Sequence, residues 1–546
     1  MALAFGAPMG TVLTLSLQQN TSIFAPLEWV PSLAQFQLVL TDLYYLRIIA
    51  ETLGIGVTVA LMSAILGFPI ALWLAKLPSQ WRGIAVAIVL IPLLTNVVVR
   101  SVGLLLLLAN GGPVSSLTGL NLLFTEAAVV IALVQVFMPF LIMALFDSLS
   151  SRDPRLDEAA SSLGAGPCDR FLLVTLPLAL PALRAGITIV FLLATTAYVS
   201  ATLLGGKKVW VVGMLVYEEA LLIQNYPLAS ALAMTLLMLC LAGTVVISAL
   251  FRRLTPWLGA QETPPQSRSR FALLPRGLAG TLDRFGVWIG RVLFAVGLAL
   301  LLLPLLFVLV NSVNDVPQAT TAAWRGFTWK WYERILFDGS SYIDAAIISA
   351  QLGIVSALCA VLIALPAAFA LVRYPSRAMG FTGTLFLLPL ALPGIALALG
   401  VLKLLQVFVL LPPFMGLVLV HGVLIAPFTL IMLRAAVENM DVRLEEAAAS
   451  LGANRLATFW YIVLPTITPA ILASAIIAFL VSFGEVTVTA FLTTARLLTL
   501  PVRIYADVQF DVEPTVNAVS ALVIIGTGLA LVILNRFISL DRVWAR

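Results

Sequence analysis

Few residues in this chain could carry out chemistry. It contains one histidine, His421, and three widely separated cysteines, Cys168, Cys240 and Cys359. This number and spacing predict neither a disulfide framework nor a metal site. No stretch fits the GxxxxGK[ST] pattern of a nucleotide-binding phosphate loop. The sequence therefore lacks the nucleophile–base pair, metal cluster or nucleotide site that an enzyme would need.

Ionisable residues inside apolar stretches are the remaining candidates, because a charge there is costly unless it faces a cavity or a partner. Glu485 lies in FLVSFGEVTVTAF, and the corresponding earlier stretch, TTAYVSATLL, contains Thr195 and Tyr198. A carboxylate beside an aromatic ring suits an amine cation. The alternative is that Glu485 pairs with a basic residue for stability. For Arg100, in NVVVRSVG, an ion pair or a bond to a backbone carbonyl is the simpler explanation.

One charged stretch occurs twice. Residues 158–177 read EAASSLGAGPCDRFLLVTLP, and residues 446–465 read EAAASLGANRLATFWYIVLP. Both fit Glu-Ala-Ala, three residues, Gly, nine residues, a β-branched residue, one residue, Leu-Pro. The second copy lies 288 positions after the first (446 − 158), without a gap. An ordinary amphipathic loop could explain one copy, but two copies in register predict a shared role.

Each copy predicts a short helix that ends in a sharp bend. An aspartate can cap the helix, acidic residues in the first turn suit the helix dipole, and alanines leave a slim surface for another protein. A glycine suits the left-handed residue that ends a helix. In the first copy these residues are Asp153, Glu158, Ala159 and Gly164, and in the second they are Asp441, Glu446, Ala447 and Gly452.

The composition predicts the elements that hold these residues. Hydrophobic residues make up 61% of the chain, charged residues 10%, and the mean hydropathy is +1.08. Continuous apolar runs of roughly 20 residues predict an all-α polytopic membrane protein rather than a β-barrel. We expect about eleven spans, near 47–75, 83–108, 126–149, 182–204, 228–250, 288–311, 342–372, 379–402, 414–437, 470–494 and 516–540.

Basic loops give the orientation, because Lys and Arg collect on the cytoplasmic side. The loop 76–82 and both copies of the repeated stretch are then cytoplasmic, so the two halves are parallel repeats. We expect a non-spanning segment at 1–46, a first half at 47–250, a cytoplasmic linker at 251–287 and a second half at 288–546. The first half would then lack an opening helix.

The repeated stretch resembles the signature of the permease subunits of binding-protein-dependent ABC importers, with Val174 in place of the usual isoleucine. LTNVVVR (94–100), TLLGGKK (202–208) and LTLPVRIYADVQFDVEPTVNA (498–518) resemble the spermidine/putrescine branch. The chain thus resembles that permease pair in fused form, with two type I ABC importer permease repeats. Similar fusions occur among iron(III) and aminoethylphosphonate importers.

The resemblance implies roles for the motif residues. In that family the stretch is a coupling helix that docks on a cytoplasmic ATPase. This role is carried to Glu158, Ala159 and Gly164, and to Glu446, Ala447 and Gly452. The substrate pathway would involve Glu485, Tyr198, Thr195 and Arg100.

The resemblance also implies partners and location. ATP and Mg would be bound by two copies of a separate ATPase subunit, so this chain would be a transport subunit without a cofactor, not an enzyme. A periplasmic or extracellular binding protein would deliver the solute, membrane lipid would surround the chain, and no nucleic acid would bind. The location would be the bacterial inner membrane. A polyamine-like solute is preferred over iron(III) or aminoethylphosphonate, and a self-contained secondary transporter is the competing class.

Overall fold

The computed structural model describes most of the chain as helices. The described residues are 2–19, 31–254, 276–337, 341–374, 393–407, 412–494, 496–510 and 513–537, with isolated positions between 376 and 389. The predicted all-α class is confirmed, since these residues form only isolated β-bridges besides helices.

Within the described ranges, ten helical stretches are long and apolar enough to cross a membrane. In the first half they are α3 (Leu43–Lys76), α5 with α6 (Val97–Thr118), α7 (Glu126–Ser150), α9 to α10 (Pro167–Thr196) and α13 (Tyr226–Leu254). In the second they are α14 (Arg276–Asn311), α16 (Ser341–Arg373), α19 (Pro413–Glu438), α21 to α22 (Arg455–Phe483) and α25 (Thr515–Phe537). The span expected at 379–402 lies partly outside the described residues, and α18 (Gly394–Val407) covers its end.

The single span expected at 83–108 is wrong. The chain forms two helices there, α4 (Ser79–Leu94) and α5 (Val97–Leu108). The Asn96 side chain accepts a hydrogen bond from the Val98 amide at 2.6 Å and so caps a new helix. A side chain that caps a helix competes with continuation of the preceding one, and periodicity does not reveal this competition.

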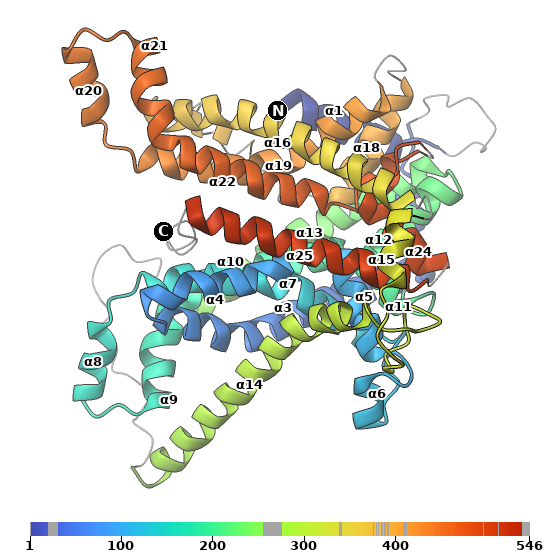
Figure 1. Ribbon diagram of the computed structural model, residues 1–546, viewed down its shortest axis with the longest axis horizontal. Helices are drawn as coiled ribbons and strands as arrows, with labels where there is room; N and C mark the ends of the chain where they lie inside the picture. The colour runs from blue at the N-terminus through green and yellow to red at the C-terminus, as the bar shows by residue number, and fades with distance from the viewer. Residues whose placement is uncertain are drawn as a thin grey trace.

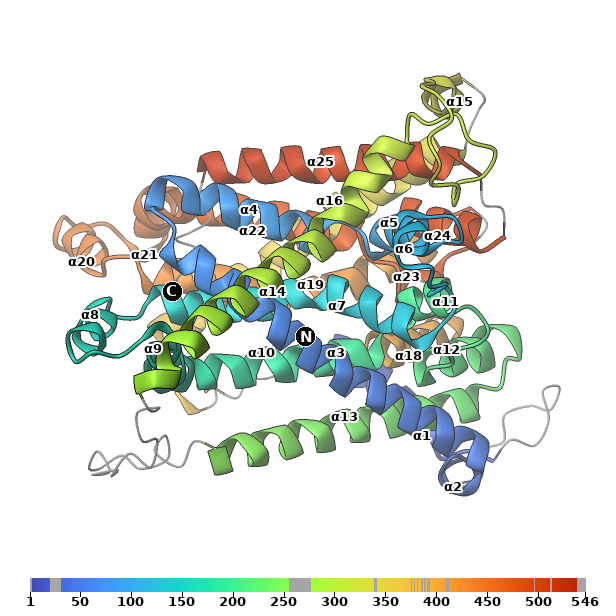
Figure 2. The same cartoon turned by 90° about the horizontal axis from the view of Figure 1, so that it is seen from below.

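The two halves form two layers that run in the same direction (Figure 1). The first half, with α3, α7 and α10 (Leu176–Thr196), lies below the second, with α16, α19 and α22 (Leu464–Phe483). The repeated stretches form α8 (Arg155–Ser162) and α20 (Arg443–Ser450), which project from the same end of the bundle. Seen from below, α13 and α25 lie at opposite edges (Figure 2). The parallel repeat is thus visible in the fold.

The first helix of each half packs on the other half. α14 contacts α3 and α5, and α1 (Ala2–Ser16) contacts α18. A Cβ on Gly103 of α5 would lie 2.2 Å from the Pro304 carbonyl oxygen of α14. A Cβ on Gly400 of α18 would likewise lie 2.3 Å from the Pro8 carbonyl oxygen of α1. The same glycine–proline contact therefore occurs twice and in exchanged positions.

The same exchange places a short helix, α1, where the second half has its opening helix, and the boundaries predicted for the segment 1–46 and the two halves stay predictions. Residues 1–46 contain α1 and α2 (Ala34–Thr41), which correspond to α14 and α15 (Lys330–Phe337). α1 as described has 15 residues, fewer than the roughly 20 that a complete span requires. α14 also begins at Arg276, inside the range expected to be linker.

Candidate functional site

Each copy of the repeated stretch starts with the predicted cap. The Asp153 carboxylate accepts a hydrogen bond from the Arg155 amide at 2.9 Å, and Asp441 accepts one from the Arg443 amide at 3.0 Å. These bonds satisfy amides that have no partner inside the helix. The capping role predicted for the two aspartates is therefore confirmed.

Each copy also ends on a left-handed glycine. Gly164 has φ +82° and Gly452 has φ +83°. The amide of the following residue donates to the carbonyl five residues earlier, at 3.1 Å in the first copy and 3.0 Å in the second. This pair of features is the Schellman ending, in which glycine avoids the strain that a Cβ would suffer. We call each helix together with its glycine bend an elbow: residues 153–166 and 441–454.

The outward surface of the elbows is formed by the motif residues and by a pair of leucines. Glu158, Ala159, Glu446 and Ala447 are all exposed, and α8 has no buried residue. Leu163 is 87% exposed and Leu451 is 89% exposed, each directly before the bend glycine. The sequence reasoning missed these leucines, although an apolar residue at one position of both charged copies was the available signal. The two leucines therefore occupy equivalent, almost fully exposed positions on the two elbows.

An ion pair joins each elbow to the bundle. Asp157 and Glu445 occupy equivalent positions, since 445 − 157 is again 288. Asp157 pairs with Arg152, whose Nη1 also donates to Thr175 Oγ1 at 2.9 Å. Glu445 pairs with Arg373, the last residue of α16, at 2.6 Å. These pairs are partly buried, so they are screened less by solvent than surface pairs. The second elbow is thus linked directly to the end of α16, and the first is linked through Arg152 to Thr175 in the helical segment that follows it.

The first elbow is also held by the other half. The helix that follows it, α9 (Pro167–Arg170), receives its cap from α14, because the Cys168 amide donates to the Asp283 carboxylate at 2.9 Å. A Cβ on Gly166 would lie 2.1 Å from the same carboxylate, so a larger residue there would displace the Asp283 side chain. In the second copy Asn454 provides its own cap, accepting from the Ala457 amide at 2.8 Å.

Broken helices meet between the halves. α10 ends at Thr196 before α11 (Val199–Gly205), and α22 ends at Phe483 before α23 (Thr489–Leu492). Asn96 Nδ2 donates to the Gly484 carbonyl at 3.1 Å, and the Tyr198 hydroxyl donates to the Thr487 carbonyl at 3.4 Å. The unwound segment 484–488 is therefore held from both ends by the first half. Discontinuous helices at a repeat interface are typical of transport sites.

Glu485 lies inside this unwound segment and caps α23. Its carboxylate oxygens accept hydrogen bonds from the Val488 and Thr489 amides, both at 2.9 Å, and from Thr489 Oγ1 at 2.7 Å. His421 Nε2 is 4.0 Å from Glu485 Oε2, and the buried His421 ring also contacts Ser482 at 2.7 Å. The side chain of Glu485 is 15% exposed. No Lys or Arg pairs with it among the described residues.

Tyr198 lies in an aromatic cluster that joins the halves. Its buried ring stacks on Tyr217 at 5.4 Å between centroids, and Tyr217 meets Phe491 edge-on at 5.5 Å. Thr195 lies elsewhere: its hydroxyl donates to the Phe191 carbonyl of its own helix at 2.7 Å, and it abuts Gly56 of α3. The structure therefore gives Thr195 a packing role.

Arg100 is buried, and its Nη1 donates to the Val136 carbonyl at 3.1 Å. Val136 lies one turn before Pro139, in the part of α7 where a proline loosens the backbone bonding. The bond to a backbone carbonyl, proposed as the simpler explanation for Arg100, is confirmed. Arg100 also lines a cavity of about 190 Å³ between the halves, together with Thr95, Asn96 and Gly484.

Comparison with known proteins agrees with this geometry. The family described as "Binding-protein-dependent transport system inner membrane component" matches residues 65–259 and 360–540, one match in each half. The chain belongs to this family, in a fused form with two permease halves. It is therefore a multi-pass protein of the bacterial inner membrane and a permease of an ABC importer.

Three proteins similar in sequence to this chain are named as polyamine permeases. The spermidine/putrescine transport system permease protein PotC of Haemophilus influenzae is 32% identical over 242 residues, which is 44% of this chain and 92% of that protein. PotC of Escherichia coli K12 is 32% identical over 244 residues, 45% of this chain and 91% of that protein. PotB of Salmonella typhimurium SL1344 is 31% identical over 205 residues, 36% of this chain and 71% of that protein.

One solved structure is similar at lower identity. It is described as the crystal structure of a bacterial ABC transporter involved in the import of the acidic polysaccharide alginate. It is 18% identical, with a TM-score of 0.40, over 46% of this chain and 92% of that chain.

Proposed function

We propose that this chain forms the whole membrane pore of an ATP-driven importer, and that its two elbows each hold one copy of a cytoplasmic ATPase subunit. The observation that carries the proposal is the duplicated elbow, with the same aspartate cap, the same left-handed glycine and an exposed leucine at each bend. An elbow that is exposed on its outer side and ion-paired to a span on its inner side is suited to transmit force. ATP and Mg belong to that partner, and a substrate-binding protein delivers the solute from outside.

A polyamine-like solute is the proposed substrate. The Glu485 carboxylate lies in the unwound segment whose Thr487 carbonyl bonds to Tyr198, so a carboxylate and aromatic rings lie near the centre of the interface. Such a pair attracts amine cations. The named function of the relatives supports the same class of solute. Iron(III) and aminoethylphosphonate are the alternatives that the assay must compare.

Alternating access is the proposed mechanism. The cluster of Tyr198, Tyr217 and Phe491 packs across the halves at one end of the pathway. The cavity beside Arg100 includes Leu531 and Leu534, near the C-terminal end of α25, so it lies on the cytoplasmic side of the unwound segment. ATP-driven approach of the elbows would open the aromatic cluster to the binding protein, and hydrolysis would reverse the movement.

Reconstitution tests this proposal. Proteoliposomes would contain the chain with a candidate ATPase and a candidate binding protein from the same organism, and uptake of putrescine, spermidine, iron(III) and aminoethylphosphonate would be compared with and without ATP. We expect ATP-dependent uptake of a polyamine. Substitution of both Glu158→Lys and Glu446→Lys should abolish uptake while the bundle stays folded. Ion-driven uptake without any ATPase would instead establish a secondary transporter.

A further inference from the structure

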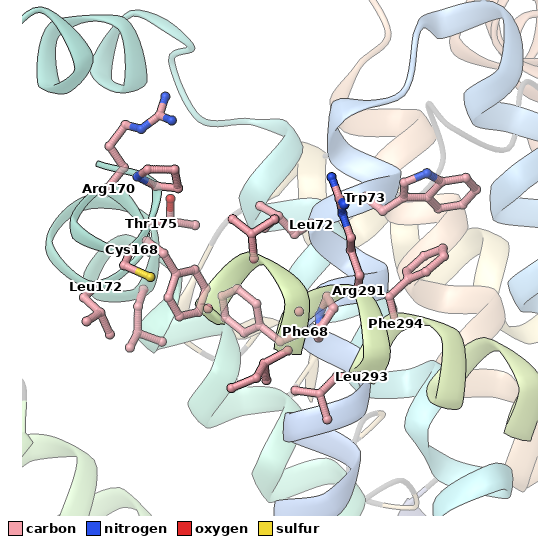
Figure 3. Close-up of a pocket in the computed structure, with 18 of the residues that line it drawn as sticks. Phe68, Leu72, Trp73, Cys168, Arg170, Leu172, Thr175, Arg291, Leu293 and Phe294 are labelled. Atoms are coloured by element: carbon pink, nitrogen blue, oxygen red, sulfur yellow. The ribbon is translucent and has the colours of Figure 1, made fainter. Parts of the chain in front are cut away.

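A large apolar groove lies beside the first elbow, where α14 of the second half packs on α3 and α9 of the first. Its volume is about 830 Å³, within the range of roughly 300–1,000 Å³ usual for ligand sites. Its walls come from α3, from α14 and from the segment of the chain that follows α8 (Figure 3). The apolar lining includes Phe68, Leu72, Trp73, Phe171, Leu293 and Phe294.

Three basic side chains from separate elements line the same groove. They are Lys76, the last residue of α3, Arg170, the last residue of α9, and Arg291 of α14. None of them forms an ion pair with the residues that the structure describes, and the Arg170 Nε is buried without a hydrogen-bond partner. The acidic residue of the lining, Asp157, is already paired with Arg152. The groove thus has an excess of positive charge.

The position of these charges relative to the membrane is defined by the chain itself. Lys76 begins the basic cytoplasmic loop 76–82, and Arg170 follows the first elbow, so both lie at the cytoplasmic end of the bundle. A phosphate group at this level would meet cationic donors, which bind phosphate strongly. The apolar walls below it would contact acyl chains. Basic pockets between spanning helices on the cytoplasmic side are suited to anionic head groups.

We propose that this groove binds an anionic phospholipid of the cytoplasmic leaflet, with its phosphate at Lys76, Arg170 and Arg291. The lipid would join α14 of the second half to α3 and α9 of the first. It would act at the point where Asp283 already caps α9. The proposal does not depend on which solute the pore carries.

The second half does not offer the same site. The position equivalent to Lys76 is Arg373, but Arg373 is bound to Glu445 at 2.6 Å. The position equivalent to Arg170 is Thr458, which has no charge. The proposal therefore predicts one tightly bound anionic lipid per chain rather than two.

Native mass spectrometry of the full chain in detergent tests the proposal by titrating phosphatidylglycerol and phosphatidylcholine with the same acyl chains. Wild type should retain one phosphatidylglycerol in preference to phosphatidylcholine. Substituting Lys76→Gln, Arg170→Gln and Arg291→Gln together should weaken phosphatidylglycerol binding about a hundredfold, because each basic residue near the surface contributes about fivefold. The matched control, Arg252→Gln with Arg253→Gln at the exposed end of α13, should bind as wild type does.

A second variant tests the groove without changing its charge. Gly290 lines the groove and a Cβ on it would meet no atom within 4 Å, so the side chain of Gly290→Trp would extend into the groove. It should remove phosphatidylglycerol binding while the unfolding temperature stays unchanged. If the triple variant does not fold, Arg291→Gln alone serves in its place. This single variant should bind phosphatidylglycerol about fivefold more weakly than wild type. Equal binding of the two lipids by wild type, or unchanged phosphatidylglycerol binding in Gly290→Trp, would overturn the proposal.

Discussion

Truncation of the two exposed leucines is the sharpest test of the elbows. Leu163 and Leu451 are almost completely exposed, so nearly the whole side chain is available to a docked partner. Leu→Ala removes three carbons, and burial contributes about 0.8 kcal/mol per carbon, or about 2.4 kcal/mol in all. Since 1.4 kcal/mol corresponds to a tenfold change, each substitution should weaken ATPase docking at its elbow about fiftyfold.

The assay is equilibrium binding of the ATPase subunit to the immobilised chain in detergent. Leu163→Ala and Leu451→Ala should each lower the affinity of one of two sites, and the double variant should lower both. Leu117 in α6 (Pro113–Thr118) is 86% exposed at the end of the bundle opposite to the elbows (Figure 1), so Leu117→Ala is a control of matched exposure. Because all three side chains are exposed, the unfolding temperature should not change. Binding by the double variant equal to that of the control would refute the reasoning.

Four further substitutions have expected outcomes. Gly452→Ala should strain the left-handed bend by about 1–2 kcal/mol and lower uptake several-fold in the reconstituted system, with the bundle's unfolding temperature unchanged. Gly103→Ala would place a Cβ against the Pro304 carbonyl and should cost about 1–3 kcal/mol, visible as a lower unfolding temperature in detergent. Glu446→Lys puts a positive charge in the first turn of α20, and ATP hydrolysis should continue while uptake falls. Glu485→Gln should reduce uptake of cationic solutes at least tenfold. If this variant keeps the wild-type KM for uptake and shows only a lower unfolding temperature, Glu485 serves solely as a cap of α23.

The elbows could be predicted from the sequence because the interactions that form them are local. The caps at Asp153 and Asp441 act on amides two residues away, and the bends at Gly164 and Gly452 depend on bonds within six residues. Because the bonded groups are close in the chain, the residue types that form these hydrogen bonds occur at fixed spacings in the sequence. The apolar runs likewise predicted most of the spans, and the orientation drawn from the charge distribution stays a prediction.

What the sequence did not reveal depends on contacts between distant segments. The cap that Asp283 gives to α9 joins residues 115 positions apart, and no periodicity marks it. Thr195 and Tyr198 are three residues apart in one apolar stretch, yet one packs on Gly56 and the other reaches the second half. In a uniformly apolar helix the sequence does not mark which face packs on a neighbouring helix, because that depends on the residues of the neighbour. The break at Asn96 was missed because capping outweighs the apolar continuity around it.

The exchanged positions of α1 and α14 connect the two halves independently of the covalent chain. α14 belongs to the second half but lies against the first at Gly103, and α1 lies against the second half at Gly400. Each of these helices also contacts its own half, α1 at α13 and α14 at α25, so each one bridges the two halves. Cutting the chain between the halves should therefore leave two fragments that remain associated through these two helices.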